Sequence, residues 1–129
     1  MITEDYVSFE IAKLLKEKGF ECEKKSITAM YNENGKFHSL STAADEYYDY
    51  NDFDEYDYIA PTLQMAMKWL RKKHRLHIDI DPSESDWNPT VITLEDWTCI
   101  VKYGDKIPVQ DTYEEACEAA IKYCLENLI

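Results

Sequence analysis

The stretch from residue 45 to residue 58 constrains this chain more than any other part of its sequence. It reads Asp45-Glu46-Tyr47-Tyr48-Asp49-Tyr50-Asn51-Asp52-Phe53-Asp54-Glu55-Tyr56-Asp57-Tyr58, in which seven residues are acidic and six are aromatic. Seven like charges repel one another over so short a span, whereas aromatic rings supply large contact areas if something covers them. We call these residues the acidic aromatic segment. We expect it to be either a charged strap over the protein's own core or a docking surface for a partner.

The charge of the whole chain points in the same direction. The 129 residues include 26 acids against 14 lysines and arginines, which gives a net charge of -12. A length of this order favours a single domain over residues 1–129. Strong negative charge repels nucleic-acid backbones and anionic lipid. It favours a protein with a basic surface as partner, or it serves solubility alone.

One part of the chain departs from this acidity. Residues 59–78 contain no acid and form a basic island. Its charged members are Lys68, Arg71, Lys72, Lys73 and Arg75.

The expected location is the cytoplasm. Residues 1–20 interleave charged and apolar residues and lack the apolar core of a signal peptide. No run approaches the roughly 18 apolar residues of a membrane span, so no membrane contact is expected. The cysteines Cys22, Cys99, Cys117 and Cys124 are then reduced thiols. Cys117 and Cys124 lie among alanines and are predicted to be small core residues.

Three segments have the apolar spacing and the end signals of helices. The first covers residues 3–18, with Thr3 as its N-cap and Gly19 just past its end. The second covers residues 62–74 and begins after Pro61. The third follows the capping box Thr112-Tyr113-Glu114-Glu115. Its apolar stripe consists of Tyr113, Cys117, Ala120, Ile121, Cys124 and Leu128.

Alternating patterns predict strands between these helices. Residues 26–31 and 36–40 flank the turn Asn32-Glu33-Asn34-Gly35 and are expected to form a hairpin. Residues 77–81 alternate as a half-buried strand does. A polar loop is expected from Pro82 to Pro89.

The region before the last helix is predicted to continue the sheet. Residues 90–103 are expected to hold one or two strands. Gly104-Asp105 then forms a hairpin turn, and residues 107–109 return at the sheet edge because Pro108 has no N–H. One set of side chains is expected to point the same way: Trp97, Cys99, Val101 and Tyr103.

These elements define a fold class. Their order is α-β-β, the acidic aromatic segment, and then α-β-β-β-α. Strands and helices do not alternate strictly, and the hairpins are antiparallel. The sequence therefore predicts an α+β domain, with two to three helices packed on one face of an antiparallel sheet.

Four stretches carry a resemblance to a known group: Val7–Phe20, Pro61–Arg71, His77–Ile80 and Thr112–Ile121. Together they are similar to small uncharacterised acidic proteins from prophages and mobile elements of gut anaerobes. The resemblance implies a phage-related origin and the same fold, and the group has no activity to carry over. The acidic aromatic segment and residues 82–89 are the variable parts.

The sequence shows no strong catalytic, metal or nucleotide signature. His38, His74 and His77 are interpreted as surface or helix-end histidines. The cysteine spacings do not match zinc-binding pairs, and the three glycines form no phosphate-binding loop. Asp79-x-Asp81-x-Ser83-x-Ser85 matches the first ligand positions of a calcium loop, but Glu84 and Thr90 occupy the places of its glycine and its bidentate glutamate. We therefore predict no catalytic residue, no metal site and no cofactor.

The C-terminal α-β-β-β-α order also resembles a double-stranded RNA-binding module. The basic island would then be its contact patch. The last helix is acidic instead of basic, through Glu114, Glu115 and Glu118, and the net charge is negative, so both features argue against nucleic acid. The basic island is otherwise a helix end that complements the helix dipole and pairs with the protein's own acids.

The sequence favours a non-enzymatic interaction module of phage or mobile-element origin. A sharper form of this hypothesis is a nucleic-acid mimic that occupies a host DNA-binding protein. The alternative is a small-molecule-binding domain or minor enzyme with a site between sheet and segment, lined by Trp69, Trp87 and Trp97. A homodimer would pair the basic island of one protomer with the segment of the other. The predicted partner-binding residues are Asp45, Glu46, Tyr47, Tyr48, Asp49, Tyr50, Asp52, Phe53, Asp54, Glu55, Tyr56, Asp57 and Tyr58.

Overall fold

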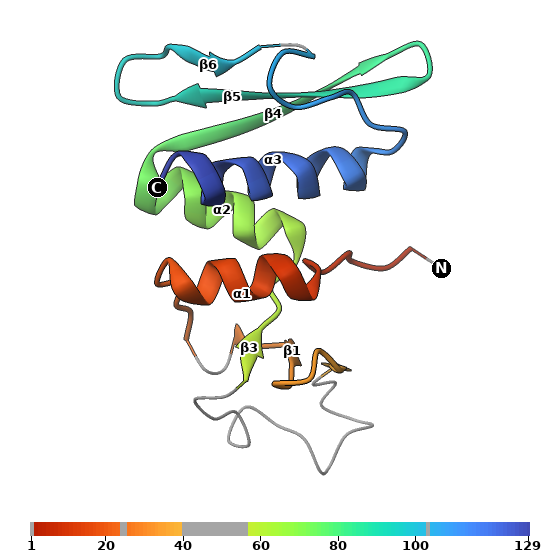
Figure 1. Cartoon of the computed structure of the whole chain (residues 1–129), viewed down its shortest axis with the longest axis vertical. Helices are drawn as coiled ribbons and strands as arrows, with labels where there is room; N and C mark the ends of the chain where they lie inside the picture. Colours follow the sequence, from red (N-terminus) through yellow and green to blue (C-terminus); the bar gives the residue numbers. More distant parts are fainter. Residues whose placement is uncertain (1, 24–25, 40–56, 103) are drawn as a thin grey trace. The chain divides into compact units, whose positions relative to one another are not determined.

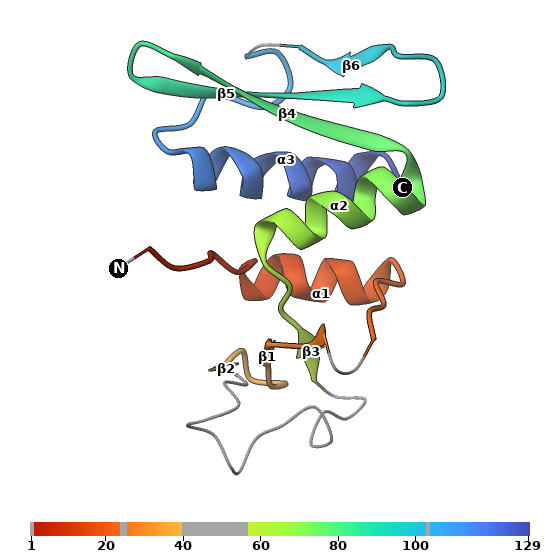
Figure 2. The same ribbon diagram turned by 180° about the vertical axis from the view of Figure 1, so that it is seen from behind.

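The chain forms two compact units, Met1–Thr62 and Leu63–Ile129, each built around a small antiparallel sheet of three strands (Figures 1 and 2). The computed structural model describes residues 2–23, 26–39, 57–102 and 104–129. The α+β class, the three helices and the antiparallel pairing are confirmed. The single sheet that we expected is replaced by two, because a third short strand, formed by Tyr58 and Ile59, completes a separate sheet before the second helix begins.

Helix α1 (Phe9–Glu17) begins later than predicted. The expected N-cap at Thr3 is wrong, because Ser8 takes this role and its Oγ accepts a hydrogen bond of 3.3 Å from the Ile11 N–H. The residues before it are extended, with the Val7 N–H donating to the Pro61 carbonyl at 3.0 Å. Serine caps a helix at least as well as threonine. The extended chain also gives the Val7 N–H a partner in the Pro61 carbonyl, and a helix that started at Thr3 would break this bond.

The end of α1 agrees with the prediction. Gly19 lies in the left-handed region, with φ of 86°. The Phe20 N–H donates to the Leu15 carbonyl at 2.8 Å and the Gly19 N–H to the Lys16 carbonyl at 3.1 Å. This pair of bonds is the Schellman arrangement, which satisfies carbonyls that the helix leaves open.

The first sheet has the strand order β2-β1-β3. It consists of β1 (Ala29–Tyr31), β2 (Phe37–Ser39) and β3 (Tyr58–Ile59). The predicted hairpin is confirmed by the antiparallel pairing of β1 with β2, although both strands are shorter than predicted. In its turn, the side-chain oxygen of Asn32 accepts from the N–H groups of Asn34 and Lys36. The hydroxyl of Tyr31 donates to the Val7 carbonyl at 2.7 Å, which ties the sheet to the chain entering α1.

The second unit contains two helices and the longer strands. Its elements are α2 (Leu63–His74), β4 (Leu76–Ser83), β5 (Asp86–Thr93), β6 (Cys99–Val101) and α3 (Tyr113–Asn127). The sheet order is β4-β5-β6. Both helices lie on the same side of this sheet (Figures 1 and 2). The observed bounds of α2 and α3 agree with the predicted bounds within a residue or two.

The polar loop predicted from Pro82 to Pro89 is wrong. Strands β4 and β5 pair over eight residues each, from Leu76 opposite Thr93 to Ser83 opposite Asp86. Trp87 directs both its N–H and its carbonyl away from β4, toward Gln110 at 2.8 and 2.9 Å. Pro82 faces Trp87 in a pair without hydrogen bonds, so its missing N–H costs the ladder nothing. Pro89 lies two residues beyond Trp87 and faces Ile80 in another pair without hydrogen bonds, so its missing N–H is not needed by β4 either.

The return strand predicted for residues 107–109 is also wrong. After β6 the chain turns, with the Asp105 N–H donating to the Lys102 carbonyl at 3.2 Å. Ile107 is buried within this irregular stretch, and the next residue to pair with the sheet is Gln110. Because Pro108 cannot donate a hydrogen bond, pairing resumes only beyond it.

Helix α3 supplies the centre of the second unit's core. The Thr112 Oγ1 accepts from the Glu115 N–H at 3.1 Å, as its predicted N-cap role requires. One face is fully buried and consists of Ala116, Cys117, Ala120, Ile121, Cys124 and Leu125. In the part of the chain that the structure describes, no helix has the length and apolar character that crossing a bilayer needs.

The two positive-φ glycines of the first unit should respond differently to substitution by alanine. A Cβ at Gly19 meets nothing within 4 Å, whereas one at Gly35 lies 2.9 Å from the Phe9 ring. We expect Gly19→Ala to lower the free energy of unfolding by about 1 kcal/mol through backbone strain alone. Gly35→Ala should lower it by about 2 kcal/mol or more, because strain and overlap add. Urea unfolding measures both. Equal losses would show that the Phe9 ring yields freely.

Candidate interaction site

Two residues of the acidic aromatic segment belong to the packing of the first unit. Asp57 is 6% exposed, and its carbonyl accepts a hydrogen bond of 2.9 Å from Lys16 Nζ. The same ammonium group lies 4.8 Å from the centre of the Tyr58 ring, and that ring meets Phe9 edge-on at 5.4 Å. These contacts give Asp57 and Tyr58 a structural role. The remaining predicted partner-binding residues, Asp45 to Tyr56, lie outside the described residues.

The basic island occupies the last turns of α2. Lys68, Lys72 and Lys73 are exposed, Arg71 is half-buried, and Arg75 follows directly after the helix. Cations at a helix C-terminus interact favourably with the negative end of the helix dipole. This position is consistent with the interpretation of the island as a helix end that complements the dipole.

Arg75 also connects α2 to the turn between β5 and β6. Its backbone is left-handed, with φ of 56°, and its carbonyl accepts a hydrogen bond of 2.8 Å from the Leu94 N–H. The Arg75 Nε lies 4.0 Å from the Glu95 Oε1, with both side chains largely exposed. Such an exposed ion pair contributes little free energy. The main-chain bond is the contact that holds the turn to the corner between α2 and β4.

The turn itself is internally braced. The Thr93 N–H donates to the Thr98 carbonyl at 2.9 Å and closes the loop. The Asp96 Oδ1 accepts from the Thr98 N–H at 3.1 Å, which is an Asx turn. Between these two bonds, Trp97 is held with φ of 63°.

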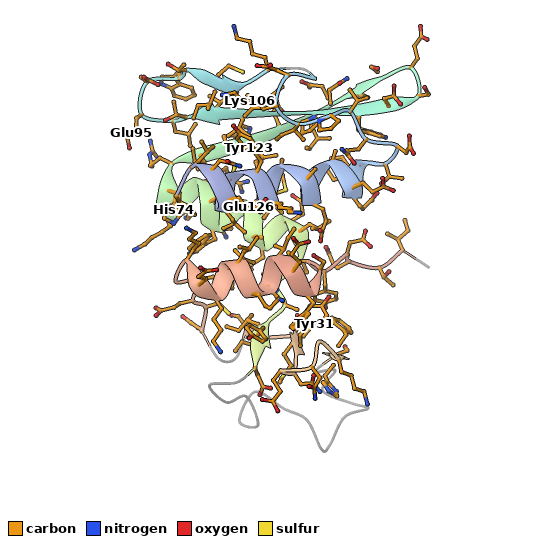
Figure 3. All side chains as sticks on the ribbon, viewed as in Figure 1. Tyr31, His74, Glu95, Lys106, Tyr123 and Glu126 are labelled. Atoms are coloured by element: carbon orange, nitrogen blue, oxygen red, sulfur yellow. The ribbon has the colours of Figure 1, made fainter. Side chains whose placement is uncertain are left out.

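Trp97 is the most unusual residue of this site. Its side chain is 77% exposed, although tryptophan carries one of the largest apolar surfaces of any residue. The left-handed backbone costs a residue other than glycine about 1 kcal/mol. The chain thus places a large ring in water on strained backbone, an arrangement that is concentrated at functional sites. We call residues 95–97 the Glu95–Trp97 tip. Glu95 projects from the end of the sheet at which β5 and β6 are joined (Figure 3).

The sequence interpretation missed this tip. Trp97 was expected to share a strand face with Cys99, Val101 and Tyr103. Strand β6 begins only at Cys99, so Trp97 lies in the preceding turn, and Tyr103 lies outside the described residues. Val101 is buried, while the Trp97 ring is not. The usable signal was the pair Glu95-Asp96, because an aspartate between two strand-forming runs favours an Asx turn.

The alternative hypothesis placed Trp69, Trp87 and Trp97 around a site between the sheet and the acidic aromatic segment, most of which lies outside the described residues. Trp69 meets the His74 ring edge-on at 4.7 Å, and Trp87 meets Tyr113 at 5.5 Å. With Trp97 exposed, each ring serves a different place in the second unit.

His74 is a helix-end histidine, as predicted. It is the last residue of α2, and in the described chain its Nε2 is shielded from solvent without a hydrogen-bond partner. Burial lowers the pKa of this imidazole, and the neighbouring Lys73 charge lowers it further. A neutral ring against Trp69 is the consequence, which fits a packing role.

The calcium-like pattern lies in regular structure. Asp79, Asp81 and Ser83 belong to strand β4, where alternate side chains share a face about 7 Å apart. Such spacing does not wrap around an ion as a loop does. Among the described residues, histidine, cysteine and acidic side chains form no group of three that could hold a metal.

The helix cysteines are core residues, as predicted. Cys117 and Cys124 are fully buried on α3. Burial raises the pKa of Cys117 to about 11 and that of Cys124 to about 12. Thiols of this kind stay protonated and unreactive at neutral pH.

No protein-family model, no curated protein and no solved structure matches this chain. The resemblance to prophage and mobile-element proteins therefore stays a prediction.

Replacing Trp97 should relieve the strain at the tip. We expect Trp97→Gly to have a free energy of unfolding about 1 kcal/mol higher than Trp97→Ala, because only glycine is unstrained at this φ. Little burial is lost in either variant. Thermal or urea unfolding of the two proteins makes the comparison, and equal stabilities would count against strain at this residue.

Burial of the Cys124 thiol should make stability fall in alkali. Its folded pKa of about 12 lies above the unfolded value of 9.0, so the unfolded chain loses the proton first as pH rises. The contribution is fully present below about pH 9 and is lost toward pH 12, at up to about 1.4 kcal/mol per pH unit. Urea unfolding at pH 8 and pH 10.5 should show a smaller loss for Cys124→Ala than for the native chain. Parallel losses would contradict the expectation.

Proposed function

We propose that this protein is a small non-enzymatic interaction module that binds a basic surface on another protein through the Glu95–Trp97 tip. The observation that carries the proposal is the exposed Trp97 ring on left-handed backbone. Binding hot spots are enriched in tryptophan, tyrosine and arginine, and covering a ring of this size yields much of the energy of an interface.

The residues around the ring define the chemistry of the partner. Glu95 and Asp96 precede Trp97 directly, and both are exposed. An arginine or lysine of the partner can lie over the face of the indole ring while the two carboxylates attract its charge. The tip therefore suits a basic surface better than an acidic or purely apolar one.

The tip is held well enough to act as an anchor. Three hydrogen bonds fix it. The Thr93 N–H donates to the Thr98 carbonyl, the Thr98 N–H donates to the Asp96 side chain, and the Leu94 N–H donates to the Arg75 carbonyl. A loop that is already ordered loses less conformational entropy on binding than a free one, so more of the contact energy appears as affinity.

The acidic aromatic segment extends the same chemistry. Both sequences combine carboxylates with aromatic rings, and a net charge of -12 steers a basic partner toward the chain. A host DNA-binding protein is one partner with such a surface, so nucleic-acid mimicry is a special case of this proposal. An origin in a phage or mobile element, as the resemblance implies, is consistent with action on a host protein.

Removing the ring of Trp97 should strongly reduce partner capture. We expect Trp97→Gly to recover at least tenfold less partner than the native chain from a lysate of the source cells, because a hot-spot contact is lost. Trp97→Tyr should stay within about threefold, since an aromatic face remains. Nuclease-treated lysates, tagged protein and quantitative mass spectrometry at low and high salt provide the measurement.

Two controls separate binding from folding. Trp97→Gly suits the backbone, so a loss of binding without any loss of stability reports the contact itself. Glu95→Gln with Asp96→Asn should weaken capture at low salt and remove most of its salt dependence. A partner that is recovered equally with Trp97→Gly, or one without a basic surface, would refute the proposal.

A further inference from the structure

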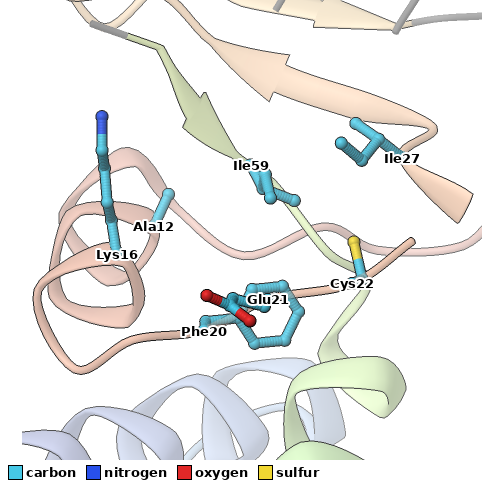
Figure 4. Close-up of a pocket in the computed structure, with 7 residues that line it drawn as sticks. All are labelled: Ala12, Lys16, Phe20, Glu21, Cys22, Ile27 and Ile59. Atoms are coloured by element: carbon cyan, nitrogen blue, oxygen red, sulfur yellow. The ribbon is translucent and has the colours of Figure 1, made fainter. Parts of the chain in front are cut away.

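The first unit contains a cavity that the interaction site does not use. It measures about 330 Å³ and lies between α1, the chain that follows α1 as far as Ile27, and strand β3. Figure 4 shows Ala12 and Lys16 on the helix side, Ile27 and Ile59 on the strand side, and Phe20, Glu21 and Cys22 along the connecting chain. Natural ligand pockets begin at about 300 Å³, so this one has the size for a small molecule.

The lining of the cavity is apolar. Ile27 and Phe20 are buried, and Ile59 packs against Ile27 from strand β3. Ala12 is 1% exposed and presents only a methyl group, which leaves room that a larger residue would fill. An enclosed apolar cavity of about 150 Å³ binds benzene. This cavity opens to solvent and has a volume of about 330 Å³, which is enough for a one- or two-ring compound.

The polar groups around the cavity do not provide a pocket for a charged ligand. The Lys16 ammonium group donates to the Asp57 carbonyl, so its aliphatic stem faces the cavity while its charge is directed away (Figure 4). Glu21 is exposed and would repel an anion. The half-buried thiol of Cys22 also lines the cavity (Figure 4), and Cys22 packs against the buried cluster of Ile27 and Met30.

Phe20 and Cys22 favour an aromatic occupant in particular. Aromatic rings gain from offset or edge contacts with a phenylalanine ring. Sulfur makes favourable contacts with ring edges, which an aliphatic ligand of equal size does not receive. The burial of Cys22 is consistent with this setting, since it raises the pKa of the thiol.

We propose that the cavity lined by Ala12, Phe20, Cys22, Ile27 and Ile59 is a binding site for an uncharged aromatic molecule of one or two rings. This activity is separate from partner binding at the Glu95–Trp97 tip, because the cavity and the tip belong to different units of the chain. Failure of either proposal leaves the other in place.

The test uses indole as the probe and Cys22 as the reporter. Iodoacetamide labelling of the full chain is followed by peptide mass spectrometry, with and without indole. We expect a dissociation constant of about 0.1–1 mM from the apolar surface that a small bicyclic ring removes from water. Near saturation, indole should slow labelling of Cys22 at least tenfold. Cys99, the half-buried cysteine of the second unit, is the internal control and should change by less than twofold.

Substitutions on α1 show whether the cavity itself is responsible. Ala12→Leu should fill it and abolish both indole binding and protection of Cys22. Glu17→Leu places the same side chain at an exposed position of the same helix and should preserve both. If Ala12→Leu unfolds at the assay temperature, Ala12→Val fills less space and should reduce protection severalfold. Benzoate, a charged ring of similar size, should protect Cys22 at least tenfold less than indole.

Three results would overturn the proposal. The first is that indole leaves the rate of Cys22 labelling unchanged. The second is that indole still protects Cys22 in Ala12→Leu. In the third, Cys22 reacts without indole only after the chain is denatured, which would mean that the protein's own residues fill the cavity.

Discussion

The eight-pair ladder between β4 and β5 is the constraint on which the second unit depends. Antiparallel pairing makes alternate residues direct their backbone groups to opposite neighbours. Along β5, Trp87 and Thr93 bond away from β4, whereas Leu94 bonds back to the Arg75 carbonyl at the start of β4. Because of this alternation, Pro82 faces Trp87 in a pair without hydrogen bonds, where β4 needs no N–H. The alternation also gives α2 and α3 one apolar face of the sheet to cover, since side chains at alternate positions share a face.

The strain at one end of that ladder follows from the same geometry. Among the described residues, Arg75 and Trp97 are the ones other than glycine with positive φ, and both lie at the end of the sheet where α2 meets β4 and β5 turns into β6. The bond from the Leu94 N–H to the Arg75 carbonyl links them. Such conformations persist when the surroundings over-determine them. An exposed tryptophan at this place buries little apolar surface, which is why we propose it as the anchor for a partner.

The first unit is stabilised in a different way. Its strands have only two or three residues each, so backbone pairing alone supplies little. Aromatic rings of Phe9, Tyr31, Phe37 and Tyr58 contact one another across α1 and the sheet at 5.4 Å. Beside these rings, Ala12 of α1 and Ile59 of β3 line the cavity of the first unit. A ligand that binds there would add to the stability of the folded chain.

The sequence alone determined the features that depend on short-range chemistry. The α+β class, the stop of α1 at Gly19, the Asn32–Gly35 turn and the capped start of α3 at Thr112 follow from local preferences that each stretch carries within itself. Burial of Cys117 and Cys124 followed from the 3.6-residue period of α3. The sequence alone did not show that residues 82–89 continue two strands. Only the pairing of β4 with β5 shows that the N–H groups missing at the two prolines are not needed. The tertiary structure also decided the start of α1, the separation into two sheets, the exposure of Trp97 and the cavity beside Ala12. Each of these features depends on which distant residues lie next to the segment in space. The periodic pattern of a segment does not specify those neighbours.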